Sequence, residues 1–442
     1  MKAGKKFPFD KLLYCNVGNP QCMKQKPMTF LREVLALTSW PELMTKCPEQ
    51  FHSDAIERAK ELIAANPGGS GAYSHSMGVQ EICKHVANYI TERDGYKADY
   101  TQIFLTNGAS QAVQDTLKLL INGPKDAILV PIPQYPLYSA SITIDGGQMI
   151  GYYLDEKNDW GLDMNKVQES LNKAKQQGLE VKALAAVNPG NPTGKCFSRK
   201  NIEDIVRLCA KEQICILADE VYQPNIYRPG DKFESFRKVI LDLGEEAKNV
   251  QLVSFHSTSK GFFGECGRRG GYLELHNFDQ AVKDQLYKLV SICCCSNVDG
   301  QYTVDVMVNP PKPGQPSYPL WEKEKNEIMS SLKRRADKLT SGLDKLEGVH
   351  CQSTDGALYT YFSITMPPKA IEAAKKKGCS PDHLYCMELL NQAGVVCVGG
   401  SGFGQEEGTF HVRSTILPPE DEVDQVIERM KKFHNEFLAR YK

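Results

Sequence analysis

Short, continuous runs of apolar residues alternate with amphipathic patterns through the middle of the chain. The runs predict six strands, at residues 103–105, 127–131, 181–187, 214–218, 250–255 and 271–275. Between them, apolar residues recur at helical spacing over 109–121 and again after Ser198, a residue type that favours a helix N-cap. Strands that are apolar at every position lie in sheets covered on both faces. We therefore predict an open α/β domain over residues 50–320, with a mainly parallel sheet flanked by helices.

The two ends of the chain show a different pattern. Helical spacing predicts helices at 29–37, 53–65 and 79–92, and the glycine-rich stretch 68–78 reads as a loop. After a proline-rich stretch, a long amphipathic helix, strands at 357–364 and 395–398, a short run at 410–414 and a final helix from Pro419 follow. We predict a smaller α+β domain built from residues 321–442 and the N-terminal residues 1–49.

Charge and composition exclude several classes of partner. The 442 residues carry a formal net charge of −1, which argues against nucleic-acid or membrane partners. No stretch reaches 18 consecutive apolar residues, and the start lacks the apolar core of a secretory signal. We predict a cytoplasmic protein, with organellar import left open if a segment precedes the sequence.

The 15 cysteines are scattered, mostly in apolar contexts, which is typical of a reducing compartment. Cys293, Cys294 and Cys295 form the densest run. Three adjacent side chains cannot all point at one tetrahedral metal ion, and no paired Cys or His motif accompanies them. We predict no metal site.

The chemistry centres on a lysine at the end of a predicted strand. The run Gln251-Leu-Val-Ser-Phe-His-Ser-Thr-Ser-Lys260 ends in two serines and an amine. A desolvated lysine can form an imine with a carbonyl compound, and Ser257, Ser259 and a nearby arginine could hold a phosphate. Taken alone, such a strand end is more typical of an ordinary solvated position.

Other predicted strand ends add complementary groups. Gly108, Ala109 and Ser110 lie where a strand enters a helix, whose N-terminus favours an anion. Asp219 ends an apolar strand, where its carboxylate needs a cationic partner such as a protonated ring nitrogen.

Further groups suit a flat ring. Tyr222 follows Asp219 closely, Asn191 lies in a proline-rich turn, and Tyr135 stands between prolines as a stacking aromatic. Singly these groups read as a cap, a turn residue or core. Together, an imine-forming lysine, a phosphate cup, an acid for a ring nitrogen and a stacking ring predict pyridoxal 5′-phosphate as the cofactor.

Three motifs resemble those of the class I, fold-type I pyridoxal-phosphate-dependent aminotransferases. They are Asn188-Pro-Gly-Asn-Pro-Thr-Gly194, Ala218-Asp-Glu-Val-Tyr222 and Ser257-Thr-Ser-Lys260. Within that family the alanine-type enzymes are most similar, through the stretches Gln25–Leu37, Tyr73–Val79, Phe255–Gly267 and Arg269–Tyr272. The glutamate–glyoxylate enzymes share much of this likeness. Relatives carry an N-terminal arm ahead of the point where this sequence begins, so arm contacts between subunits stay open.

The resemblance implies a role for each candidate residue. Lys260 would carry the cofactor and shuttle a proton, Asp219 would keep the ring nitrogen protonated, and Tyr222 and Asn191 would bind the phenolic oxygen. The resemblance assigns ring stacking to Tyr135. It assigns phosphate binding to Ala109, Ser110, Ser257, Ser259 and Arg269, and places Gly108 among the cofactor-binding residues. The family at large favours Arg268 for the phosphate, whereas the alanine-type motif favours Arg269.

The resemblance also implies a substrate site and a partner. Arg413 would bind the substrate α-carboxylate, Asn191 would also contact the substrate, and Gly18 would approach it with its backbone. Tyr73 would cross to the cofactor phosphate of the other subunit in a homodimer with shared active sites.

The predicted activity is ping-pong transamination, with L-alanine and 2-oxoglutarate giving pyruvate and L-glutamate. Three alternatives stay open: a glutamate- or glyoxylate-preferring transaminase, a lyase or aminocyclopropane-carboxylate synthase reaction on the same scaffold, and a non-catalytic sensor with this fold.

Overall fold

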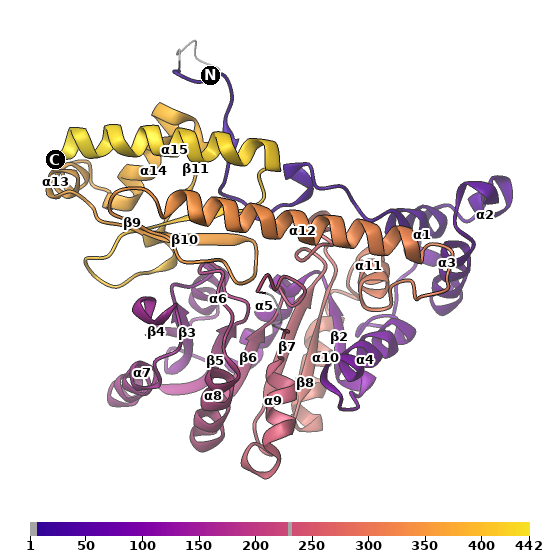
Figure 1. Cartoon of the computed structure of the whole chain (residues 1–442). Coiled ribbons are helices and arrows are strands. Elements are labelled where there is room, and N and C mark those ends of the chain that lie inside the picture. Colours follow the sequence, from indigo (N-terminus) through magenta and orange to yellow (C-terminus); the bar gives the residue numbers. More distant parts are fainter. Residues whose placement is uncertain (1–6, 229–231) are drawn as a thin grey trace.

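The apolar strands of the middle of the chain form one seven-stranded sheet in the computed structural model, which describes residues 7–228 and 232–442 (Figure 1). Their order is β2-β8-β7-β6-β5-β3-β4. The bounds are β2 (Ile103–Thr106), β3 (Asp126–Ile132), β4 (Gln148–Tyr153), β5 (Glu180–Val187), β6 (Cys215–Asp219), β7 (Leu252–Ser257) and β8 (Gly271–His276). Neighbouring strands are parallel except that β8 runs antiparallel to both β2 and β7. The mainly parallel sheet is confirmed.

Helices cover both faces of this sheet, as the continuous apolar strands require. One face packs on α5 (Ala109–Leu120), α6 (Leu137–Ile144) and α10 (Gln280–Ser291), and the other on α7 (Met164–Gln176), α8 (Arg199–Glu212) and α9 (Phe236–Leu243). Successive strand residues enter opposite cores: Ile216 packs with α8, and Leu217 packs with α5. Both are fully buried, which removes every face of β6 from water.

A helical layer lies beside strands β2 and β8. It comprises α1 (Thr29–Ser39), α2 (Leu43–Lys46), α3 (Ser53–Ala65), α4 (Gln80–Asp94) and α11 (Val298–Val308). Phe30 and Val34 of α1 share a core with Ala59 of α3 and Val86 of α4. The N-terminal segment therefore contacts the large-sheet side as well as the small domain, and the domain boundaries at residues 50 and 320 stay a prediction.

A smaller antiparallel sheet lies across the top of the large one in Figure 1, under α12 and α15. Its order is β12-β13-β10-β9, and a two-stranded parallel pair, β1 with β11, joins the N-terminal segment to it. The elements are β1 (Leu13–Tyr14), α12 (Tyr318–Leu343), β9 (Val349–His350), β10 (Tyr359–Ile364), α13 (Pro368–Lys376), α14 (Pro381–Ala393), β11 (Val395–Val396), β12 (Val398–Gly399), β13 (His411–Thr415) and α15 (Glu420–Tyr441).

Some elements carry little signal in the sequence. Strand β4 is an edge strand with one buried residue, and its run at residues 149–153 was not predicted as a strand. The strand predicted at 395–398 is interrupted at Cys397, because β11 pairs with β1 while β12 pairs with β13. Helices α2, α6, α7, α9, α10, α11, α13 and α14 were not predicted.

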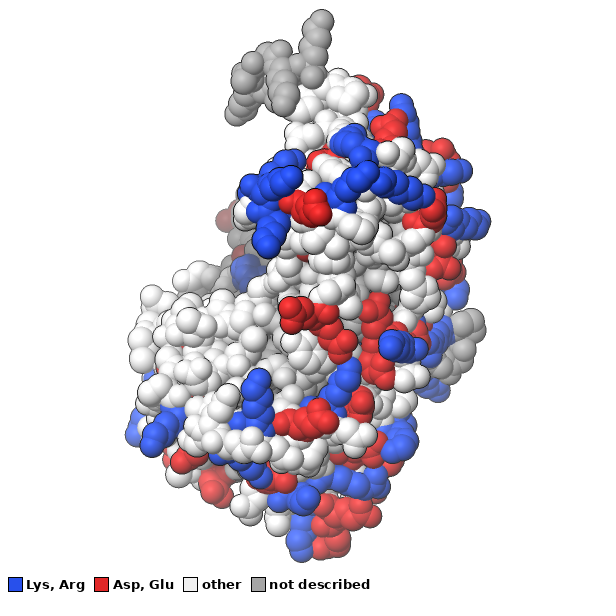
Figure 2. All heavy atoms as spheres, turned by 90° about the vertical axis from the view of Figure 1, so that its left-hand side faces the viewer, with Lys and Arg blue, Asp and Glu red and all other residues white. Residues whose placement is uncertain are grey.

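The surface agrees with a chain of balanced charge. Figure 2 shows lysines and arginines interspersed with aspartates and glutamates on one face, with neither sign dominating it. In the part of the chain that the structure describes, no helix combines the length and apolar character needed to cross a bilayer.

Candidate active site

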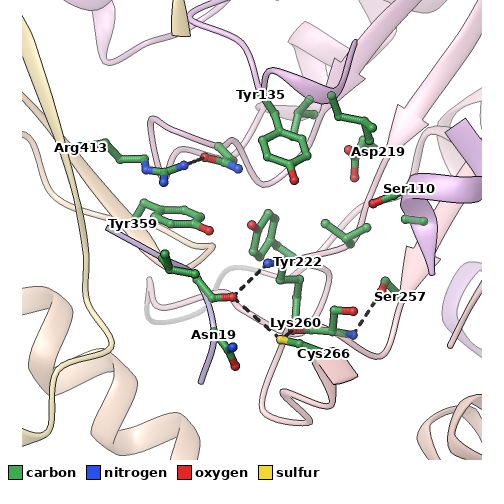
Figure 3. Close-up of a pocket in the computed structure, with 18 of the residues that line it drawn as sticks. Asn19, Ser110, Tyr135, Asp219, Tyr222, Ser257, Lys260, Cys266, Tyr359 and Arg413 are labelled. Atoms are coloured by element: carbon green, nitrogen blue, oxygen red, sulfur yellow. Dashed lines mark hydrogen bonds between the residues drawn. The ribbon is translucent and has the colours of Figure 1, made fainter. Parts of the chain in front are cut away.

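A cavity of about 390 Å³ opens at the carboxyl ends of β5, β6 and β7, beneath β13 of the small sheet (Figure 3). Ligands of open α/β sheets bind at this edge. The cavity brings together most of the residues singled out from the sequence: Gly18, Ala109, Ser110, Tyr135, Asn191, Asp219, Tyr222, Ser257, Ser259, Lys260, Arg269 and Arg413.

Lys260 lies at the centre of the floor, three residues after β7. Its Nζ donates a hydrogen bond to the carbonyl oxygen of Gly18 at 3.1 Å and lies 6.0 Å from the centre of the Tyr222 ring. A side chain at Gly18 would collide with the Tyr359 hydroxyl. The N-terminal segment can therefore approach the amine this closely only with glycine at this position.

Asp219 is buried at the end of β6 and faces the cavity (Figure 3). Burial raises the pKa of its carboxyl to about 6, although the Val221 N–H, the Tyr138 hydroxyl (which donates to Oδ2 at 3.4 Å) and the Lys260 charge oppose the rise. Oδ1 has no hydrogen-bond partner among the described residues. A buried carboxylate oxygen left unpaired fits a ligand that brings its own N–H or positive charge.

A cup of hydrogen-bond donors lies at one end of the cavity. Ala109 and Ser110 form the first turn of α5, whose N-terminal N–H groups favour an anion, and Ser257 and Ser259 lie opposite on and just after β7. Arg269 completes the cup. Hydroxyls, free N–H groups and a guanidinium are the groups that bind phosphate.

The structure separates the two adjacent arginines. Arg269 donates to the Asn107 carbonyl oxygen at 2.9 Å and to Ser259 Oγ at 3.3 Å. Its guanidinium passes so close to Gly108 that a side chain there would clash, and the positive φ of 78° at Gly108 also favours glycine. Arg268 lines a separate surface groove beside Arg32.

Arg413 enters the cavity from β13 at the opposite end. Its Nη1 donates to Asn191 Oδ1 at 3.1 Å and its Nη2 to the Asn16 carbonyl oxygen at 2.7 Å. The guanidinium also lies over the rings of Tyr359 and Phe403, at 4.3 and 4.6 Å from their centres. These contacts hold a planar fork suited to a carboxylate.

Three aromatic rings shape the space between these ends. Tyr135 is 38% exposed at the start of α6, and Tyr222 and Tyr359 meet edge to face with ring centres 6.3 Å apart. Burial and the neighbouring Tyr359 hydroxyl raise the pKa of Tyr222 well above its ordinary value. Its hydroxyl therefore stays protonated and able to donate.

Two predicted site residues lie outside the cavity lining. Gly108 is the N-cap of α5 beneath Arg269, and Tyr73 is 80% exposed on a loop away from the cavity. Eight lining residues were not predicted: Asn16, Val17, Asn19, Leu137, Val187, Val221, Cys266 and Tyr359. Tyr359 carried no signal of its own, because only the pairing of β10 with β13 brings it beside Arg413. Cys266 lies in the stretch Phe255–Gly267 that resembles the alanine-type enzymes, but the sequence indicated no role for it.

The charges of the cavity suit an anionic cofactor and an anionic substrate. Lys260, Arg269 and Arg413 supply three cationic side chains against the one carboxylate of Asp219. Arg269 and Arg413 mark two separate ends for two anionic groups, with the amine between them. The cavity therefore fits a phosphorylated aldehyde with a basic ring and a small carboxylate substrate.

Comparisons with known proteins agree with this geometry. The family described as aminotransferase class I and II matches residues 48–430. "Probable alanine aminotransferase, mitochondrial" of Dictyostelium discoideum is 47% identical over 441 residues, which cover 99% of this chain and 83% of that protein. "Glutamate--glyoxylate aminotransferase 2" of Arabidopsis thaliana is 47% identical over 434 residues, covering 98% and 90%.

The fold is shared with solved structures as well. The structure of the alanine aminotransferase from Pyrococcus furiosus superimposes with a TM-score of 0.77 at 24% identity, covering 97% of this chain and 93% of that one. The segment that matches the aminotransferase family, residues 48–430, includes Asp219, Lys260 and Arg413 and spans both sheets. The chain belongs to the class I and II aminotransferase family.

Proposed function

We propose that this chain transfers the amino group of L-alanine to 2-oxoglutarate, giving pyruvate and L-glutamate in a ping-pong reaction. The observation that carries the proposal is one cavity that joins Lys260 and Asp219 to Arg413 from the small sheet. The choice of alanine is supported by a relative 47% identical over nearly the whole chain whose name states that activity.

Class I aminotransferases use pyridoxal 5′-phosphate, and the residues present fit it. We assign the phosphate to Ser110, Ser257, Ser259, Arg269 and the N–H of Ala109, and ring stacking to Tyr135. The unpaired Oδ1 of Asp219 supports its assignment to the pyridine nitrogen. When bound, the cofactor supplies an aldehyde that takes up the amino group and a ring that accepts electron density from the substrate Cα.

Lys260 is the proposed proton carrier. Its Nζ takes a proton from the substrate Cα, which requires a neutral amine within hydrogen-bond reach of that carbon. Asp219 keeps a positive charge on the ring nitrogen, and Tyr222 and Asn191 hold the phenolic oxygen. Tyr222 can donate because its raised pKa keeps the hydroxyl protonated.

Arg413 is the proposed carboxylate ligand of the substrate. Asn191 and the Asn16 carbonyl already orient its guanidinium, so little side-chain freedom remains to be lost on binding. The Gly18 backbone closes the same side of the cavity. Any α-amino or α-oxo acid carries this carboxylate, so one arginine serves both halves of the reaction.

The finer partners and location belong to the same proposal. We infer a homodimer in which the exposed Tyr73 reaches the site of the second subunit. A cytoplasmic location remains our prediction, and the names of several relatives state a mitochondrial one.

The half-reaction with L-alanine alone tests the proposal. Purified, cofactor-loaded protein mixed with L-alanine should lose the absorbance of the lysine-bound cofactor and release stoichiometric pyruvate. Lys260→Ala should abolish turnover and retain some bound cofactor. Release of ammonia, or no spectral change with any amino acid, would reject transamination in favour of a lyase or a binding protein.

Glutamate–glyoxylate transamination is the second candidate, since a relative with that name is equally identical. The two are separated by kcat/KM for each amino donor with glyoxylate and with 2-oxoglutarate as acceptors. A preference for glutamate with glyoxylate over alanine with 2-oxoglutarate would favour the second candidate.

A further inference from the structure

The short loop between Lys260 and Arg269 contains a thiol whose role is unassigned. Cys266 lines the cavity, and its Sγ lies 3.0 Å from the carbonyl oxygen of Ser259 and 3.9 Å from that of Gly18. Figure 3 shows Cys266 beside the Lys260 side chain, and the Gly18 carbonyl oxygen is in contact with both residues. The thiol therefore contacts the peptide group that leads into Lys260.

The Gly18 carbonyl oxygen lies near both the amine and the thiol. Lys260 Nζ donates to it at 3.1 Å, whereas the Cys266 Sγ lies 3.9 Å from it. A thiol has one weak donor, and the shorter distance directs it to Ser259. The sulfur thereby occupies the space under the Gly18 carbonyl and leaves that acceptor to Lys260.

Contacts on both sides of Cys266 fix the loop independently of the thiol. Glu265 accepts two hydrogen bonds from Arg32 of α1, at 2.9 and 3.1 Å, and its N–H donates to the Thr258 carbonyl oxygen. Arg269 Nη1 donates to the Cys266 carbonyl oxygen at 3.0 Å. The backbone at Cys266 is therefore anchored, and its side chain has a defined target.

We propose that Cys266 is a positioning residue for Lys260: its thiol fixes the Ser259–Lys260 peptide group and separates it from the Gly18 carbonyl, which aligns the amine. This inference rests on the proposed role of Lys260. Its physical basis is that the reactive amine extends from a peptide group whose carbonyl oxygen is held by one side-chain donor. Small displacements of a reactive group lower rates steeply.

The test compares three variants of the full-length protein. Cys266→Ala removes the donor, and Cys266→Ser keeps a donor in nearly the same place. Cys379→Ala is the matched control, because Cys379 is also half-buried and its Sγ donates to a helix carbonyl oxygen, that of Ala374, at 3.7 Å. Thermal midpoints of all variants report any general loss of packing.

The decisive readout is the rate at which cofactor-free protein attaches pyridoxal 5′-phosphate to Lys260, followed by absorbance. We expect Cys266→Ala to slow attachment and lower kcat by about tenfold, with the KM for the amino acid changed by less than about twofold. Cys266→Ser should recover most of both rates, and Cys379→Ala should match the wild type.

Two outcomes overturn the inference. If Cys266→Ala attaches the cofactor as fast as Cys379→Ala, the thiol does not position Lys260. If Cys266→Ser is as slow as Cys266→Ala, the sulfur acts through its volume and not as a donor. Failure of the proposed function is distinguishable, because then the wild type itself would neither attach the cofactor at Lys260 nor transaminate.

Discussion

At the scale of single residues, Asp219 combines a functional position with a cost in stability. Its folded pKa of about 6 exceeds the ordinary value of 3.8, so the buried charge opposes folding above pH 6 and ceases to do so near pH 4. In the cofactor-free protein this difference corresponds to at most about 3 kcal/mol at neutral pH. A bound cation would remove the penalty, which is typical of a site organised for its ligand.

We therefore predict that Asp219→Asn stabilises the cofactor-free protein while it impairs catalysis. The free energy of unfolding should rise by about 1–3 kcal/mol at pH 7.5 and change little at pH 4, since the neutral amide removes only the buried charge. Activity should fall by a factor of about 100 or more, because the ring nitrogen loses its partner. Chemical denaturation at both pH values, with steady-state kinetics, measures both effects. An equal stability change at both pH values would contradict the charge argument.

Arg413 makes a different prediction, in substrate binding. Arg413→Lys keeps the charge but loses the planar fork and the contacts to Tyr359 and Phe403. We expect the KM values for the amino acid and for the oxo acid to rise together, by about 10- to 100-fold. Arg440→Lys, an exposed arginine on α15, serves as the control and should leave both KM values unchanged. A rise in KM for only one of the two substrates would indicate that Arg413 contacts that substrate's side chain and not the α-carboxylate that both substrates share.

At the scale of elements, the ends of apolar strands were the most informative part of the sequence. Asp219 and Lys260 could be located because β6 and β7 are buried on both faces and a polar residue after such a run is conspicuous. Arg413 lies in a strand that local pattern also marks, but its contacts could not be predicted: Tyr359 reaches it from the paired strand β10, and Asn16 from the N-terminal segment. Pairings between segments that lie far apart in the sequence leave no local signal.

A bridge between the two sheets illustrates such a pairing. His411 of β13 lies two residues from Arg413, and its Nε2 lies 2.9 Å from Glu156 Oε2, in the turn that follows β4. Its ring also stacks on Tyr361, with centres 4.8 Å apart. Burial raises the pKa of Glu156, but the contacts with His411, together with smaller effects of Ser363 and His350, outweigh it and the pKa is lowered.

We predict that Glu156→Gln weakens this bridge in a pH-dependent way. A carboxyl with a lowered folded pKa adds stability above its ordinary value of 4.5 and loses it as the pH falls through the folded pKa. The variant should lose about 1 kcal/mol of unfolding free energy at pH 7, and the loss should become smaller as the pH falls below 4.5. Glu406→Gln is the control, because Glu406 pairs with Lys166 nearby at an exposed position and its loss should matter less. A larger loss in the control would assign the stability to surface charge.

At the scale of the whole molecule, the cavity is built from segments spread along the whole sequence. The N-terminal segment supplies Gly18, the large sheet supplies Asp219 and Lys260, and the small sheet supplies Arg413. Tyr73 is the one predicted aromatic site residue that lies outside this cavity, and it is 80% exposed. Single exposed aromatic residues are common on protein surfaces, so the role of Tyr73 in a second subunit stays a proposal that needs its own test.

Mixing two inactive variants tests whether sites are shared. If Tyr73 of one subunit serves the other, a dimer of Lys260→Ala with Tyr73→Ala has one site with an intact lysine and an intact tyrosine. Random exchange of equal amounts should then restore about a quarter of wild-type activity, because half of the dimers are mixed and each has one complete site of two. If Tyr73 serves its own subunit, neither site of the mixed dimer is complete and activity stays at the average of the separate variants.

The control mixes Lys260→Ala with Tyr287→Ala, which removes another part-exposed tyrosine. This mixture should give only the average activity of those two proteins. Activity above the average of the separate proteins in the mixture with Tyr73→Ala, and not in the mixture with Tyr287→Ala, would show that each active site is completed by a second copy of the chain.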